Sequence, residues 1–188
     1  MSRSAHQPFL VAVALLCATS LPAQNPAAAP AAPDLSDPEV AHVAVTANAI
    51  DIELAKLALA RTRAPAVRQF AQIMITDHSA VNGQAAALAG KLGVAPQDNA
   101  VSQSLQAGAT QVRATIEPQQ GAAFDRAYID REVAYHQAVL DAIDKLLVPT
   151  TEHTELKQLL VDVRPAIATH LEHAKQVRSQ LSTWGTGK

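Results

Sequence analysis

Cysteine, aromatic side chains and net charge are all scarce in this chain of 188 residues. A single cysteine excludes a framework of internal disulfides. With 15 basic and 17 acidic residues and no basic stripe, the chain lacks the charge pattern that binds nucleic acid, so we expect no nucleic-acid partner. Only 3% of the residues are aromatic and long alternating β-branched runs are absent, which disfavours a β-sheet.

Common catalytic motifs are missing as well. The sequence has no serine flanked by glycines that would form a nucleophile elbow, and no glycine-rich loop that would bind phosphate. Once the N-terminal segment described next is removed, no cysteine is left for nucleophilic catalysis. Hydrolase chemistry is therefore disfavoured, and we assign no catalytic residue.

The N-terminus has the pattern of a signal peptide, which we place at residues 1–23. A basic residue precedes an apolar run at residues 9–18 that is too short to span a bilayer, and small residues follow it. Cleavage after Ser20 and cleavage after Ala23 both fit this pattern.

Lipid attachment at Cys17 is disfavoured, because Leu16 stands where a lipoprotein signal has a small residue. The mature chain contains no other apolar stretch of transmembrane length. We therefore expect an exported protein, in the periplasm or associated with the outer membrane. It would have no transmembrane span and would have a partner in the cell envelope.

The rest of the chain is rich in alanine and leucine and has helical periodicity. A Pro/Ala-rich linker is expected at residues 24–36, a folded domain at 37–183 and a tail at 184–188. Prolines and glycines separate the helices, and Pro165 is expected to kink or divide the last one. The predicted helices span residues 37–62, 65–92, 101–116, 122–147 and 152–181.

Four of these helices are long and joined by short connections, which favours antiparallel packing. The shorter helix at residues 101–116 lies in the connection between the second and third long helices. The predicted fold class is therefore all-α, a ferritin-like antiparallel four-helix bundle with an extra short helix in that crossover.

One predicted helix, with the sequence FDRAYIDREVAYHQAVL, has ionisable residues on its apolar side. Counting about 100° per residue places Asp125, Glu132 and His136 on the side that carries the aliphatic residues. Arg126 and Arg131 are expected to point elsewhere. This arrangement is unusual, because a buried charge without a partner is strongly destabilising.

The other long helices also carry carboxylates or imidazoles at or near their apolar stripes. His170 lies in the middle of the stripe of the last helix, and Asp77 and His78 flank the stripe of the second. Glu53 lies on a line between two apolar stripes of the first helix. We therefore expect polar groups from different helices to meet inside the bundle.

Carboxylates and imidazoles that face one another in a helix bundle are the ligand set of di-metal sites. The Glu-x-x-His pattern of those sites is absent, and its relatives here are Glu132-x-x-x-His136 and His170-x-x-His173. A mixed carboxylate and imidazole set suits iron, manganese or zinc. The candidate metal ligands are Asp77, His78, Glu132, His136, His170 and Glu53.

The same residues also fit structural roles that involve no metal. Asp77 and His78 also fit a hydrogen-bonded pair between helices, Glu132 and His136 an ion pair within one helix, and Asp125 a helix cap. The alternative function is a non-enzymatic cell-envelope module, structural or interacting, whose buried polar network fixes helix register without a metal. The sequence does not indicate the oligomeric state.

Three stretches carry a family resemblance: FAQIMITDHSAVN at 70–82, FDRAYIDREVAYHQ at 124–137 and RPAIATHLEHAKQV at 164–177. They resemble the signature stretches of a bacterial family of unknown function, DUF4142, whose members are described as exported or outer-membrane proteins with a ferritin-like fold. The resemblance extends over about residues 42–181 and implies a helical bundle and export, but no established activity. Arg164 is a departure, because the family tends to have leucine before this proline.

Overall fold

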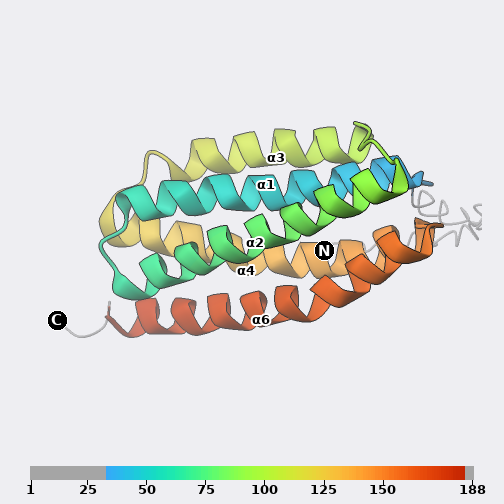
Figure 1. Ribbon diagram of the computed structural model, residues 1–188. Coiled ribbons are helices and arrows are strands. Elements are labelled where there is room, and N and C mark those ends of the chain that lie inside the picture. The colour runs from blue at the N-terminus through green and yellow to red at the C-terminus, as the bar shows by residue number, and fades with distance from the viewer. Residues whose placement is uncertain (1–32, 185–188) are drawn as a thin grey trace, which may run out of the picture. The chain divides into compact units, whose positions relative to one another are not determined.

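Five long helices make up most of the computed structural model, which describes residues 33–184 (Figure 1). The predicted signal peptide, most of the predicted linker and residues 185–188 lie outside the described residues. No strand occurs within residues 33–184, so the all-α prediction is confirmed. The helices are α1 (Asp37–Arg61), α2 (Pro65–Leu92), α3 (Ala100–Ile116), α4 (Gly121–Ala142), the π-helix η1 (Ile143–Leu147), α5 (Val148–Thr150) and α6 (Thr154–Trp184).

Local sequence explains where the helices begin and end. Ser36 is the N-cap of α1, and its backbone N–H and hydroxyl donate to the Glu39 carboxylate at 2.9 and 2.7 Å. Asp37 accepts hydrogen bonds of 2.9 Å from the two backbone N–H groups that precede α6. α2 ends at Gly93, whose φ of 65° is the left-handed conformation that favours glycine.

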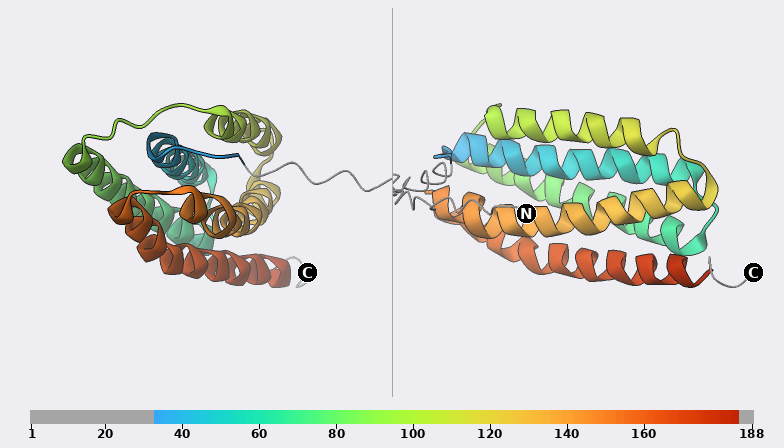
Figure 2. Two further views of the ribbon diagram at one scale, coloured as in Figure 1. Left: turned by 90° about the vertical axis from the view of Figure 1, so that its right-hand side faces the viewer. Right: turned by 180° about the vertical axis from the view of Figure 1, so that it is seen from behind.

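α1, α2, α4 and α6 lie around a common interior, and α3 lies against the outer side of α1 (Figures 1 and 2). α1 and α2 are antiparallel, as are α4 and α6. α2 and α4 run in the same direction, because α3 carries the chain back along the length of the bundle between them. None of the described helices is both long enough and apolar enough to cross a membrane.

Two parts of the helical chain depart from simple α-helix. The helix predicted to reach residue 147 changes to π geometry over its last five residues, η1. α6 continues through Pro165 without dividing, and it bends along its N-terminal half (Figure 1). The charge of Arg164, beside this proline, pairs with Asp144 of η1 through two contacts of 2.7 Å.

Apolar residues form two buried clusters along the bundle. On α4, Ile129 belongs to the first cluster and Leu140 to the second. On α6, Ala174 belongs to the first and Ile167 to the second. Glu132 and His136 on α4 and His170 on α6 lie between these positions, so these polar groups lie between two apolar cores.

Candidate metal centre

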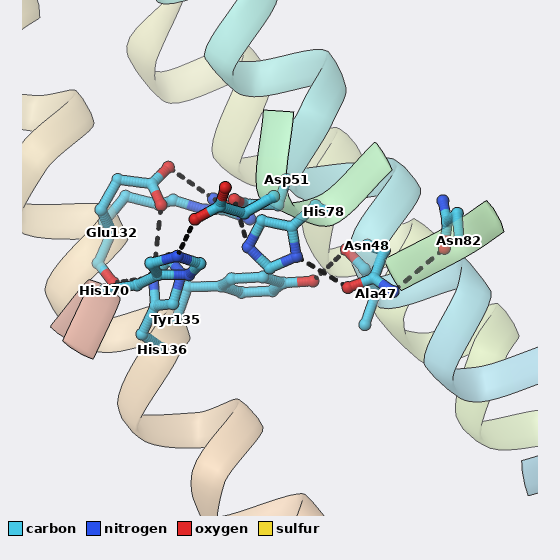
Figure 3. Close-up of polar contacts among 11 residues, drawn as sticks. Ala47, Asn48, Asp51, His78, Asn82, Glu132, Tyr135, His136 and His170 are labelled. Carbon is cyan, nitrogen blue, oxygen red and sulfur yellow. Dashed lines mark hydrogen bonds and ion pairs between the residues drawn. The ribbon is translucent and has the colours of Figure 1, made fainter. Parts of the chain in front are cut away.

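Four helices bring five ionisable side chains together inside the bundle (Figure 3). α1 provides Asp51, α2 His78, α4 both Glu132 and His136, and α6 His170. None of these side chains is more than 5% exposed. We call these five residues the polar cluster. The expectation that Glu132, His136 and His170 point inward and meet is confirmed by their burial and proximity.

The three imidazoles of the polar cluster lie close enough to share one ion. Ring centroids are 5.7 Å apart for His78 and His136, 5.3 Å for His78 and His170, and 5.4 Å for His136 and His170. One potential ligand atom from each ring lies within 4.8 Å of those of the other two. Asp51, Glu132 and His136 form a second group that meets the same limit.

Hydrogen bonds determine which nitrogen of His136 and His170 carries the hydrogen. Nδ1 of His136 lies 2.9 Å from the backbone carbonyl oxygen of Glu132, which can only accept, so Nδ1 donates. Nε2 of His170 lies 2.9 Å from Oδ2 of Asp77 and donates to it. In the neutral rings, the lone pairs are therefore on Nε2 of His136 and Nδ1 of His170. Both nitrogens are buried and lack a hydrogen-bond partner.

His78 is oriented by two asparagines. Its Nδ1 lies 2.7 Å from Oδ1 of Asn48, and Nδ2 of Asn48 donates to Oδ1 of Asn82 at 3.0 Å. This orientation of the Asn48 amide makes Nδ1 of His78 the donor, so the lone pair of the neutral ring is on Nε2. Nε2 lies 3.2 Å from Oδ2 of Asp51. Each of the three imidazoles thus has one nitrogen held by a neighbouring acceptor and presents the other to the cluster.

Arg131 holds the two carboxylates of the polar cluster. Its Nη1 lies 2.6 Å from Oδ1 of Asp51 and 2.6 Å from Oε1 of Glu132. The second oxygen of each carboxylate, Oδ2 of Asp51 and Oε2 of Glu132, is buried without a hydrogen-bond partner. The guanidinium also lies over the ring of Tyr135, 3.7 Å from its centroid, and Tyr135 donates from its hydroxyl to the backbone of Ala47.

The surroundings shift the pKa values of the two carboxylates in opposite directions. Burial raises the pKa of Glu132 well above its usual value, and the attraction of Arg131 offsets only part of that effect. Burial also acts to raise the pKa of Asp51, but the charge of Arg131 and the nearby imidazoles outweigh it, so the pKa lies below its usual value. The two carboxylates therefore differ in how strongly they hold a proton, Glu132 more strongly than Asp51.

Burial also favours the neutral form of two of the imidazoles. It lowers the pKa of His136 to about 4, although the Asp51 carboxylate opposes this shift. Burial likewise lowers the pKa of His78, again against the effect of Asp51. Because both rings are neutral near pH 7, each offers a free nitrogen lone pair, which is the form that binds a metal ion.

The remaining candidates from the sequence lie outside the polar cluster or at its edge. Asp77 is about half exposed and contacts the cluster only as the acceptor for His170. Glu53 is exposed and pairs with Lys56 at 2.7 Å, so the expectation that it joins the cluster is wrong. Asp125 is buried, but α4 begins at Gly121 with Gln120 as N-cap, so it does not cap the helix.

Sequence reasoning missed two members of the site. Asp51 was not selected, and Arg131 was expected to point away from the interior, whereas its side chain is only 9% exposed. The signal for Asp51 is its position three residues before Leu54 and seven before Ala58, both buried. Alanines such as Ala58 lie on that face of α1. Most of the larger aliphatic side chains of the helix lie on other faces, and the prediction was based on them.

This is therefore an all-helical protein with a buried cluster of histidines and carboxylates. The model of the family described as "Domain of unknown function (DUF4142)" matches residues 21–177, and the chain belongs to this family. A comparison with curated proteins gave no significant match. The solved structure of CopM in the Cu(II)-bound form is similar, with a TM-score of 0.59 and 15% sequence identity over 79% of this chain and 99% of that chain. At this identity the similarity shows the fold alone.

Proposed function

We propose that this protein binds one divalent transition-metal ion within the polar cluster. The ligands are Nε2 of His78, Nε2 of His136 and Nδ1 of His170, with Oδ2 of Asp51 as the fourth. Each of these atoms is buried without a hydrogen-bond partner, and each belongs to a side chain that a neighbouring group already orients. Such outer partners are typical of metal-binding histidines, because they fix the tautomer and the ring orientation.

The observation that carries the proposal is the contact between His78 and Asp51. With Nδ1 of His78 donating to Asn48, two acceptors, Nε2 and the Asp51 Oδ2, face each other at 3.2 Å. Two buried lone pairs repel at this distance unless a cation or a proton lies between them. Two ligands of a tetrahedral ion with bonds near 2.0 Å are about 3.3 Å apart, so the spacing suits a shared metal.

The donor set favours copper or zinc over the other metals considered. Three imidazoles and one carboxylate suit these two ions, and affinity rises from manganese through iron to copper. Arg131 already neutralises much of the charge of Asp51 and Glu132, which weakens the oxygen-rich group that iron and manganese would use. The solved structure of CopM is in the Cu(II)-bound form, which is a property of that protein. It makes copper the first ion to test here.

The finer fold and the location are also part of the proposal. We infer a ferritin-like arrangement because α1, α2, α4 and α6 each provide a side chain to one site and because the chain makes one long crossover through α3. We infer export to the periplasm or outer membrane because the first 23 residues have the signal-peptide pattern. In that compartment the protein would bind or buffer the metal.

Variants that keep each orienting hydrogen bond and remove only the ligand nitrogen test the proposal. Asparagine replaces the Nδ1 donor of a histidine and glutamine the Nε2 donor, so the variants are His78→Asn, His136→Asn and His170→Gln. His42→Gln, a substitution of a histidine outside the cluster, is the matched control.

Calorimetric titration of the metal-free protein with Cu(II), Zn(II), Fe(II) and Mn(II) measures the outcome. We expect one Cu(II) or Zn(II) per chain for the unsubstituted protein and the control, and at least about tenfold weaker binding for each of the three variants. Equal binding by all five proteins would contradict the proposal. Absence of binding by any of the four metals would instead favour the metal-free envelope module.

A further inference from the structure

A second site lies towards the end of the bundle where α2 ends and α6 begins. A cavity of about 460 Å³ is bounded by the N-terminal halves of α1 and α6, the C-terminal half of α2 and the end of α4. Alanine, valine and leucine side chains form most of its wall. The lining residues of α2, such as Val81, Ala85 and Ala89, are partly exposed, so the cavity is accessible from that side.

The size of this cavity is sufficient for a small ligand. Protein interiors pack to high density, and an apolar void destabilises the fold in proportion to its volume. An engineered apolar cavity of about 150 Å³ stays dry and binds benzene, and this one is about three times larger. By the same ratio, it accommodates a ligand of about 18 non-hydrogen atoms.

The charges around the cavity restrict the kind of ligand. Among residues 33–184, no lysine or arginine lines it, and the one acid that does, Asp37, already accepts two backbone hydrogen bonds. An anionic head group would find no counter-charge there, and a cationic one would be desolvated by aliphatic walls. The lining includes His153, whose Nδ1 is buried without a partner, and Asn82, whose amide accepts from Asn48. These side chains suit a neutral oxygen, as in an alcohol, a ketone or an ester.

We infer that this cavity binds a neutral, mainly aliphatic ligand of roughly 15–20 non-hydrogen atoms with one oxygen-bearing head group. The inference is independent of the metal site. The cavity and the polar cluster share one wall, since Asn48 lines the cavity and also accepts the hydrogen bond from His78.

Fluorescence titration tests the inference on the full chain treated with a chelator, so that no metal contributes. The probe is N-phenyl-1-naphthylamine, an uncharged fluorophore of suitable size. Dodecanol, dodecanoate and dodecylammonium then compete with it at equal concentration. We expect saturable binding of one probe per chain, displaced by dodecanol at about tenfold lower concentration than by either ion. Equal displacement by the three competitors would contradict the neutral-ligand assignment.

A matched pair of substitutions on α2 locates the binding. Ala85 lines the cavity, whereas Ala87 is exposed on the same helix and does not. Ala85→Phe should weaken probe binding at least about tenfold and Ala87→Phe should leave it unchanged. Ala85→Leu fills less of the space and should give an intermediate loss of probe binding. This variant replaces Ala85→Phe in the test if the phenylalanine variant does not fold. Equal probe binding by the Ala85 and Ala87 variants would overturn the inference. The inference would also be overturned if the protein bound no probe and substitution of Ala85 changed its oligomeric state, because the surface would then be an interface between copies.

Discussion

Nε2 of His78 and Oδ2 of Asp51 lie 3.2 Å apart in the interior of the bundle, and neither atom has a hydrogen to donate to the other. The two residues come from adjacent helices, α2 and α1, and both side chains are almost fully buried. The metal proposal explains this contact, because a cation between the two atoms turns their repulsion into coordination.

Asp51→Asn should reduce the stabilisation of the protein by metal. The new amide can donate to the Nε2 lone pair of His78 while its oxygen still accepts from Arg131, but the substitution removes a charge that pairs with the buried guanidinium. We therefore expect a less stable metal-free protein and a smaller rise in melting temperature on adding Cu(II) than for the unsubstituted protein. Thermal unfolding with and without Cu(II) measures both effects. An undiminished rise would show that Asp51 is not a ligand.

Arg131→Met should destabilise the fold strongly. Without the guanidinium, the carboxylates of Asp51 and Glu132 lose the cation that both contact at 2.6 Å, in a site where both are fully buried. Removing one partner from a buried ionic group costs about 3–5 kcal/mol. Denaturant unfolding measures this loss. Arg126→Met, on the exposed side of α4, is the control and should change stability by less than about 0.5 kcal/mol.

If the two arginine variants had similar stabilities, Arg131 would not be the group that neutralises the cluster.

The stability of the metal-free protein should increase with pH between about 4 and 6.5. The pKa of His136 is lowered by burial to about 4, against 6.5 for an ordinary histidine, so over this range the unfolded chain binds more protons than the folded one. This group contributes about 3 kcal/mol above pH 6.5, which is lost as the pH falls towards 4. Denaturant unfolding over this pH range checks the slope.

In His136→Asn the slope should be smaller, and in His42→Gln it should be retained. Part of the slope should remain in the first variant, because burial lowers the pKa of His78 in the same direction. An unchanged slope in His136→Asn would show that His136 does not titrate in this way.

The tautomers of the metal-free protein should be opposite for two histidines of the cluster. His136 donates from Nδ1 to a backbone carbonyl and His170 donates from Nε2 to Asp77. Nitrogen-15 NMR of the imidazole rings at neutral pH distinguishes the two forms. The same tautomer for both rings would mean that one of the ligand nitrogens assigned above is not available.

The sequence predicted the fold and part of the site for a clear reason. Helical periodicity is a local property, so it located the five long helices and showed that Glu132, His136 and His170 face the interior. The lengths of the connections predicted only in outline which helices would pack against one another. The change to π geometry at η1 had no recognisable local signal.

The missed residues depend on tertiary packing. Arg131 points away from the core on a helical wheel, yet its long side chain reaches Asp51, which is 80 positions away in the sequence. Asp51 itself lies on a face of α1 where Ala55 and Ala58 allow close helix packing, so the search for large aliphatic stripes passed over it. Glu53 was chosen instead, and it is exposed.

Anomalous diffraction from crystals grown with Cu(II) or Zn(II) tests the metal site most directly. The account predicts one strong peak within about 2.0–2.2 Å of Nε2 of His78, Nε2 of His136 and Nδ1 of His170. A protein that binds metal only at surface groups such as His42 and Asp98, or that shows no peak among the three imidazoles, would contradict it.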